Sequence, residues 1–174
     1  MNACGLEKFE LLDIGSHLPG DALAEFLERT ELLRDLNWEQ LKRIGAYLEA
    51  RALPANTHVF REGDAGEYWC VILKGNIDVI KEVSPGHSCV IASLRPGTTL
   101  GEMAIIDGER RSANACTTQP THILALKSDR FNQLLKDYPG LGTEILKQIA
   151  RLLSRRLRRT SGQLADYLEM KKFD

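Results

Sequence analysis

LGEMAIIDGERRSA, residues 100–113, lies between two segments with strand character and carries the most specific pattern in this chain. After the small residue Gly101 it predicts a short helix, whose first N–H groups have no partner in the helix and can hold an anion. A carboxylate, Glu102, stands in the first turn, and the guanidinium of Arg111 follows at the far end of the loop. One acceptor and one planar set of donors suit a ligand with both a hydroxyl group and a phosphate. The residue types alone leave open an ordinary loop in which Glu102 and Arg111 pair with each other.

Short segments with strand character lie on both sides of this stretch. They are rich in β-branched and aromatic residues, and turn signals such as Lys74-Gly75-Asn76 and Arg95-Pro96-Gly97 separate them. Strands at this spacing predict an α+β, mainly β fold built on an antiparallel β-barrel or jelly roll, not a βαβ sheet. The predicted strands cover residues 58–60, 68–73, 77–83, 89–94, 114–117 and 122–126.

Helical periodicity precedes and follows the strands. Asp21 and Asn37 are the expected caps of two N-terminal helices, and Ser128 is the expected cap of a third. The third helix must stop before Pro139-Gly140, which forms a joint in front of a long final helix. The predicted helices cover residues 21–36, 37–50, 128–138 and 141–168. We therefore expect an N-terminal extension (1–20), a barrel with its N-terminal helices (21–140) and a C-terminal lid or dimerisation helix (141–174).

The final helix carries an apolar seam with steps of three and four residues, which predicts a homodimer through this helix. The alternative is a helix that lies back on its own barrel. The seam consists of Ala150, Leu153, Leu157, Thr160, Leu164 and Tyr167. Its arginines could meet nucleic acid or an acidic membrane, but we interpret them as the solvated face of a dimer helix. These arginines are Arg151, Arg155, Arg156, Arg158 and Arg159.

Composition excludes several classes of protein. The chain has 174 residues, a net charge of −1, and 43% hydrophobic and 27% charged residues. This is a globular composition, without the basic excess of a protein that coats nucleic acid. No apolar run approaches the length of a membrane span and no secretion signal is visible, so we expect a cytoplasmic protein. The cysteines form no metal-binding pattern and are expected to be buried free thiols. They are Cys4, Cys70, Cys89 and Cys116.

The stretch GEMAIIDGERRSA, residues 101–113, closely resembles the phosphate-binding cassette of cyclic nucleotide-binding domains. This family includes protein kinase A regulatory subunits, cyclic nucleotide-gated channels and bacterial catabolite activator protein. Its pattern is roughly F-G-E-[LM]-A-[LI]-[LI], a short insert, then R-[AST]-A, and only Leu100 departs from it. The resemblance runs from about residue 37 to the end of the last helix and includes Tyr68, Ile72 and Gly75.

The resemblance implies a role for each cassette residue. Glu102 and the amide of Gly101 would hold the ribose 2′-hydroxyl of a cyclic nucleotide. Arg111 would pair with the cyclic phosphate, helped by the amides of Ala104 and Ser112 and by the Ser112 hydroxyl. Arg110 stands one position too early to match the family's arginine, and we interpret it as a solvated side chain. The implied ligand-binding residues are Gly101, Glu102, Met103, Ala104, Arg111, Ser112, Ala113, Thr160 and Ser161.

Thr160 and Ser161 come from a second point of similarity. The run from Arg155 to Ser161 resembles the dimer helix of catabolite activator protein, where a Thr-Ser pair meets the adenine. Thr160 would contact the base in its own subunit and Ser161 would reach the ligand of the partner. Thr160 could instead donate to a carbonyl one turn back. Ser112 suits either base, so this Thr-Ser pair is what favours cAMP over cGMP.

These observations predict a sensor that binds cAMP, with cGMP as the second choice, and that couples binding to movement of the final helix. The family's transcription regulators continue into a helix-turn-helix, which we do not expect in a chain of this length. A ligand-free scaffold and the ligand domain of a longer regulator remain alternatives. A jelly-roll metalloenzyme is disfavoured because no histidines form an H-x-H pair, so we expect no catalytic residue, metal or cofactor. The histidines are His17, His58, His87 and His122.

Overall fold

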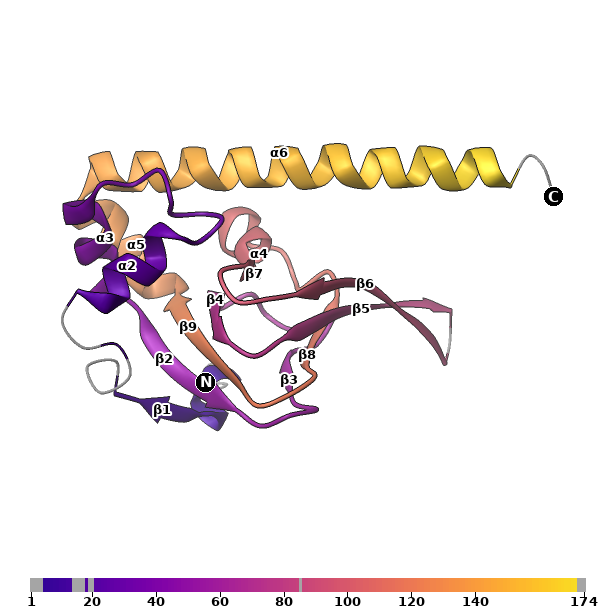
Figure 1. Ribbon diagram of the computed structural model, residues 1–174, viewed down its shortest axis with the longest axis horizontal. Helices are drawn as coiled ribbons and strands as arrows, with labels where there is room; N and C mark the ends of the chain where they lie inside the picture. The colour runs from indigo at the N-terminus through magenta and orange to yellow at the C-terminus, as the bar shows by residue number, and fades with distance from the viewer. Residues whose placement is uncertain (1–4, 14–17, 19–20, 85, 172–174) are drawn as a thin grey trace.

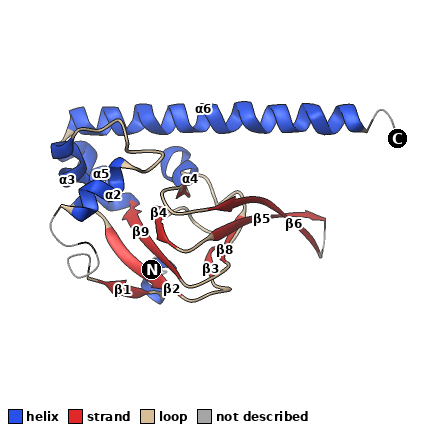
Figure 2. Ribbon diagram, viewed as in Figure 1, coloured by secondary structure: helices blue, strands red, loops and turns tan. Residues whose placement is uncertain are grey.

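The computed structural model describes residues 5–13, 18, 21–84 and 86–171. Two antiparallel sheets form its β part, and a helical layer lies at one end of them (Figures 1 and 2). The first sheet has the order β1 (Glu10–Leu12), β2 (Glu49–Leu53), β9 (Thr121–Lys127), β4 (Tyr68–Lys74) and β7 (Thr99–Leu100). The second has the order β3 (His58–Phe60), β8 (Asn114–Thr117), β5 (Ile77–Ser84) and β6 (His87–Leu94). The predicted mainly β jelly-roll fold is thus confirmed, with two separate sheets and no closed barrel.

Strand β4 shows why the domain has two hydrophobic cores. Its side chains alternate, so Cys70 and Ile72 enter the core between the two sheets. Trp69 and Val71 enter the second core, which lies between the first sheet and the helices. Because β4 is buried on both faces, its sequence is apolar at nearly every position.

The helices are η1 (Gly5–Lys8), α2 (Ala22–Glu28), α3 (Trp38–Gly45), α4 (Glu102–Asp107), α5 (Ser128–Asp137) and α6 (Pro139–Met170). The first two predicted helices are shorter than expected. Helix α2 ends at Glu28, and the Thr30 hydroxyl donates to the Leu27 carbonyl oxygen at 2.6 Å in the turn that follows. The predicted Asn37 cap is confirmed, because its side chain accepts from the Gln40 amide at 3.0 Å in a capping box.

Asp21 stands at the predicted N-cap position of α2 but its side chain does not cap the helix, and the predicted Ser128 cap of α5 is wrong. The Asp21 side chain makes no capping bond and instead lies 2.8 Å from the Lys42 ammonium. Helix α5 is preceded by Lys127, and the Ser128 hydroxyl donates to the Gly66 carbonyl oxygen at 3.3 Å. In both cases a partner distant in sequence takes the side chain that a local pattern assigned to the helix end.

Residues 49–53 form strand β2, although the first two of them were predicted as the end of a helix and the other three were assigned to no element. This segment, EARAL, consists of good helix formers, so its strand conformation comes from pairing with β9 and β1. Strands β1 and β7 were also missed, because each has three residues or fewer and too little pattern to recognise.

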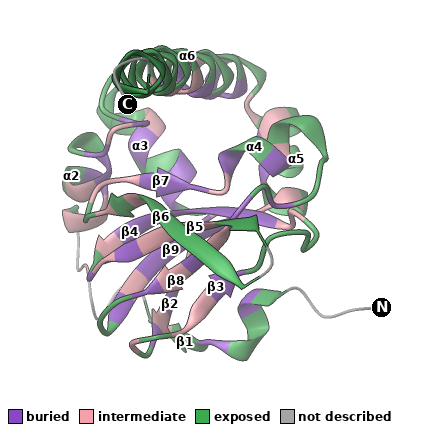
Figure 3. Cartoon of the chain, turned by 90° about the vertical axis from the view of Figure 1, so that its right-hand side faces the viewer, coloured by how far each residue is buried: buried purple, intermediate pink, exposed green. Residues whose placement is uncertain are grey.

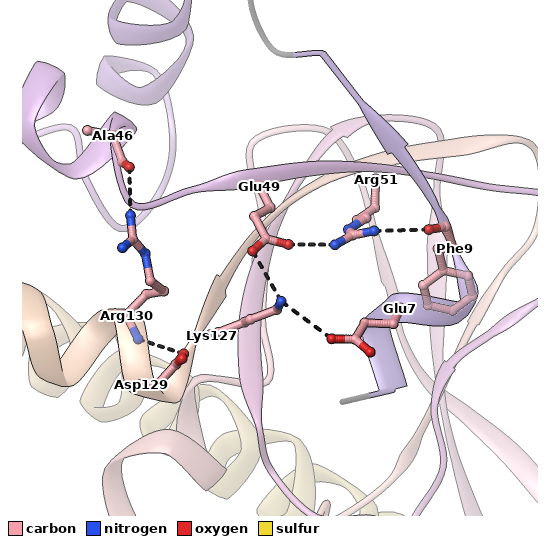
Figure 4. A network of polar contacts seen from close by, with 8 residues as sticks. All are labelled: Glu7, Phe9, Ala46, Glu49, Arg51, Lys127, Asp129 and Arg130. Atoms are coloured by element: carbon pink, nitrogen blue, oxygen red, sulfur yellow. Dashed lines mark hydrogen bonds and ion pairs between the residues drawn. The ribbon is translucent and has the colours of Figure 1, made fainter. Parts of the chain in front are cut away.

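The N-terminal segment folds onto the first sheet. Leu6 and Phe9 are buried in the core between the sheets. Figure 4 shows the ties: the Arg51 guanidinium donates to the Phe9 carbonyl oxygen at 3.1 Å and to the Glu49 carboxylate at 2.6 Å. The Lys127 ammonium lies 3.2 Å from the same carboxylate. Burial raises the pKa of Glu49, but the hydrogen bonds from Arg51 and Lys127 outweigh burial and lower the pKa below 4.5.

Helix α6 begins two residues earlier than predicted, with Pro139 in its first turn and Tyr138 as the joint with α5. Its first half packs on the helical layer through Leu141, Ile145 and Leu152. Its second half runs along and beyond the sheets, with every residue from 157 to 170 exposed (Figures 1 and 3). The face packed on its own domain therefore differs from most of the predicted seam.

The remaining predictions concern turns and thiols. Gly75 has the expected positive φ, +91°, and a Cβ there would meet the Pro120 carbonyl oxygen at 2.7 Å. Cys70 is buried as expected, but Cys89 is exposed on β6, so the prediction of a buried thiol is wrong there. Pro19-Gly20 and Cys4 lie outside the described residues.

Candidate functional site

The cassette is built on helix α4 and the loop that returns to β8. Gly101 precedes α4 with φ +82°, in the left-handed region that favours glycine. A Cβ at this position would lie 2.6 Å from Nη1 of Arg111. Glycine is therefore required twice at this position, by the backbone turn and by the guanidinium packed against it.

Glu102 is buried, with 2% of its surface exposed. Its Oε1 accepts a hydrogen bond from Nη1 of Arg156 on α6 at 2.6 Å, whereas its buried Oε2 has no hydrogen-bond partner. Burial raises the pKa of this carboxyl group above 4.5, and the positive charge of Arg156 partly offsets that rise. One oxygen of this buried carboxylate thus lacks a hydrogen-bond donor among the described residues.

Arg111 is also buried, with 3% of its surface exposed. Its guanidinium donates to the carbonyl oxygens of Gly101, at 2.9 Å, and Tyr68. The guanidinium carbon also lies 4.2 Å from the Phe60 ring centre and 4.9 Å from that of Tyr68. Burial lowers the pKa of Arg111, and its Nε has no partner. A pairing of Arg111 with Glu102, the alternative left open by the sequence, is not what the structure shows.

The other cassette residues fall into two groups. Ala104 and Ala113 are buried, and Ala104 lies so close to Gly66 that a Cβ on Gly66 would come within 2.1 Å of the Ala104 Cβ. Met103 and Ser112 are exposed. The structure therefore brings Gly101, Glu102, Met103, Ala104, Arg111, Ser112 and Ala113 together in one loop-and-helix unit.

Two cassette contacts were missed by sequence reasoning. Arg110 is exposed, but it is not merely solvated: its Nη1 donates to the Gly63 carbonyl oxygen at 2.7 Å. The ammonium of Lys81 on β5 donates to the Ser112 carbonyl oxygen at 2.7 Å and pairs with Glu62. No sequence pattern joins residues 62, 81 and 112, so only the sheet register could reveal this contact.

Thr160 and Ser161 are exposed on the distal half of α6, and among the residues that the structure describes no hydrogen bond joins them to the cassette. Arg156, one turn earlier, does reach it: besides Glu102 it donates to the Thr99 carbonyl oxygen at 2.8 Å. The interpretation of all five arginines as a solvated face is therefore wrong for Arg156. A signal was present, since Arg156 continues the buried stripe of Ile149 and Leu152 at helical spacing.

In the part of the chain that the structure describes, neither a metal-ligand cluster nor a membrane-spanning helix is present. No three His, Cys, Asp or Glu side chains there cluster in a way that could hold a metal ion. None of the described helices combines the length and the apolar character needed to cross a bilayer.

The fold and the cassette together define a ligand-binding regulatory domain. The family model of the cyclic nucleotide-binding domain matches residues 50–138, which is more than half of the chain. The chain therefore belongs to the cyclic nucleotide-binding domain family.

Similar proteins include regulators and a kinase. The chain is 26% identical over 144 residues to the CRP-like cAMP-activated global transcriptional regulator of Mycobacterium tuberculosis, covering 83% of this chain and 62% of that protein. It is 32% identical over 115 residues to the cGMP-dependent protein kinase, isozyme 1, of Drosophila melanogaster, covering 64% and 15%. A cyclic nucleotide-binding domain from Methylobacillus flagellatus KT matches with a TM-score of 0.79 and 28% identity over 94% of each chain. The chain thus spans under two thirds of the length of the Mycobacterium regulator and of the Drosophila kinase.

Proposed function

We propose that this protein is a regulatory sensor that binds a cyclic nucleotide, cAMP in preference to cGMP, and that ligand binding is coupled to the position of α6. The observation that carries the proposal is the buried carboxylate of Glu102, one oxygen of which is held by Arg156 on α6 while the other has no partner. A buried polar atom without a partner is costly, and a ribose hydroxyl would supply the missing hydrogen bond.

In this proposal Arg111 binds the cyclic phosphate. Its guanidinium is held against the cassette by the Gly101 carbonyl oxygen and by two aromatic rings, so its position is fixed before the ligand arrives. Its Nε is a buried donor without a partner, which an anionic oxygen would satisfy. The amides of Ala104 and Ser112 and the Ser112 hydroxyl complete the phosphate site.

Preference for cAMP rests on Thr160 and Ser161. Both are exposed in the single chain, and Leu157 and Leu164 on the same half of α6 are exposed as well. Exposed apolar residues at this spacing support a dimer helix, in which Thr160 meets the base and Ser161 the ligand of the partner. The Mycobacterium relative is named for activation by cAMP and the Drosophila relative for dependence on cGMP, so the similar proteins do not choose between the bases.

Coupling to α6 follows from where Arg156 sits. A ribose hydroxyl that binds Glu102 acts on the carboxylate that Arg156 of α6 contacts. In this proposal α6 turns relative to α5 at Tyr138, which lies between the two helices. Such a ligand shifts the position of α6 only if it binds the two positions with different affinity. We propose no catalytic role for the chain.

Calorimetry with cAMP and cGMP tests the proposal, with Arg111→Ala and Arg110→Ala as matched variants. We expect cAMP to bind more tightly than cGMP, and Arg111→Ala to lose about 100-fold in affinity while Arg110→Ala stays close to wild type. Arg111→Lys, which keeps the charge, controls for folding when circular dichroism shows that Arg111→Ala is unfolded. No heat with either nucleotide at high micromolar concentration would instead identify a scaffold that has kept the fold.

A further inference from the structure

Glu31, in the turn between α2 and α3, lies close to the guanidinium of Arg156, which contacts the carboxylate of Glu102. Its carboxylate lies 3.5 Å from Nη2 of Arg156 and 4.0 Å from Nη2 of Arg155. Arg156 is therefore shared between two carboxylates: Nη1 donates to Glu102 and Nη2 faces Glu31. Three segments distant in sequence meet at this one side chain.

The backbone of Glu31 is fixed to the same part of the domain as the cassette. Its amide donates to the Gly97 carbonyl oxygen at 3.1 Å, in the turn that leads into β7 and then into Gly101. The following residues, Leu32 and Leu33, are buried in the helical core. Glu31 is thus a carboxylate whose backbone is held by the turn that leads into the cassette, whereas Arg155 and Arg156 belong to α6.

We infer that Glu31 is a positioning residue of the nucleotide site, which aims the Arg156 guanidinium at Glu102 and holds α6 against the cassette. Arg156 donates hydrogen bonds to Glu102 and to the Thr99 carbonyl oxygen, and the Glu31 carboxylate adds an ion pair on the side of Nη2. This role rests on the proposed binding of a cyclic nucleotide. Glu31 touches no ligand in it and acts only through Arg156.

The expected size of the effect follows from exposure. The side chains of Glu31 and Arg156 are 38% and 35% exposed, so solvent weakens their attraction. Glu31→Gln removes the charge with little change of shape, and we expect it to weaken cAMP binding about threefold. Because the pair is exposed, the loss must shrink in 1 M salt, where the Debye length is about 3 Å. A purely structural defect would persist at that salt concentration.

A double-mutant cycle tests the inference. Calorimetry with cAMP is carried out on wild type, Glu31→Gln, Arg156→Gln and the double variant, in low and high salt. Glu31→Gln should cost affinity in the wild-type background and nothing further in the Arg156→Gln background, because its effect passes through that side chain. Glu28→Gln, an exposed carboxylate on α2 with the same change of charge, is the matched control and should bind like wild type.

The outcomes separate this inference from the function on which it rests. Failure of wild type to bind cAMP or cGMP rejects the proposed function and this role with it. If wild type binds cAMP and Glu31→Gln binds it with the same affinity, the inference alone is rejected. It is also rejected if Glu31→Gln loses the same affinity in the wild-type and in the Arg156→Gln background. Urea denaturation of the same four proteins without nucleotide checks whether the two side chains are coupled before any ligand is present; additive effects there also count against Glu31 as the residue that fixes Arg156.

Discussion

The guanidinium of Arg156 and the carboxylate of Glu102 lie 2.6 Å apart, although 54 positions separate them in the sequence. One residue belongs to the long C-terminal helix and the other to the first turn of the cassette helix. Their contact joins the cassette to α6, and it is the contact through which the proposed nucleotide would act on the position of that helix.

Replacement of Arg156 by Gln should weaken cAMP binding about tenfold at neutral pH, because Glu102 then stays buried without its cation and its pKa rises further. Calorimetry measures this loss. Arg158→Gln, an exposed arginine two residues further along α6, is the matched control and should bind like wild type. Equal affinities for all three proteins would show that the ion pair has no part in binding.

The affinity for cAMP should depend on pH through Glu102. Burial raises the pKa of the free carboxyl group above 4.5, and a bound ribose hydroxyl favours its ionised form, so binding releases a proton. Affinity should therefore be highest above the raised pKa and should fall as the pH is lowered through it toward 4.5. Glu102→Gln cannot ionise, and its weaker binding should lose this pH dependence. Parallel pH profiles for the two proteins, measured by calorimetry, would contradict the assignment.

Gly66→Ala should disturb the cassette, because Gly66 packs against Ala104 of helix α4. Its new Cβ would come within 2.1 Å of the Ala104 Cβ, a distance that forces α4 to move. We expect a loss of about 1–3 kcal/mol in the free energy of unfolding, measured with urea, together with weaker cAMP binding. Gly140→Ala is the control, since a Cβ there meets no atom within 4 Å. A Gly66→Ala protein as stable as this control would mean that α4 adapts without strain.

The dimer predicted from the α6 seam depends on exposed apolar residues. Leu157 and Leu164 are 68% and 56% exposed in the single chain. Light scattering should give a dimer for wild type and a monomer for the Leu157→Ser, Leu164→Ser double variant, since burial of these side chains stabilises the seam. Lys147→Ser, on the same helix, should remain dimeric. A wild-type monomer at high concentration would remove the structural basis for contacts from Thr160 and Ser161.

Strong local patterns in the sequence predicted their segments well. The capping box at Asn37, the alternating strands after Pro54 and the turn at Gly75 each carry their own physical reason within a few residues, and all were found. Strand β2 was missed because its residues favour a helix locally and only pairing with β9 makes them a strand.

The residues of the candidate site also fall into those that a local sequence pattern predicted and those that only the fold revealed. The cassette, with Glu102 near its start and Arg111 near its end, could be predicted from the sequence because its residues are adjacent in the chain. The cation that faces Glu102 could be identified only from the fold, since it depends on the rotation of α6 and on where the buried stripe of that helix meets the cassette. The buried stripe of α6 indicated that Arg156 faces the domain, but only the fold showed that its guanidinium lies between the carboxylates of Glu102 and Glu31.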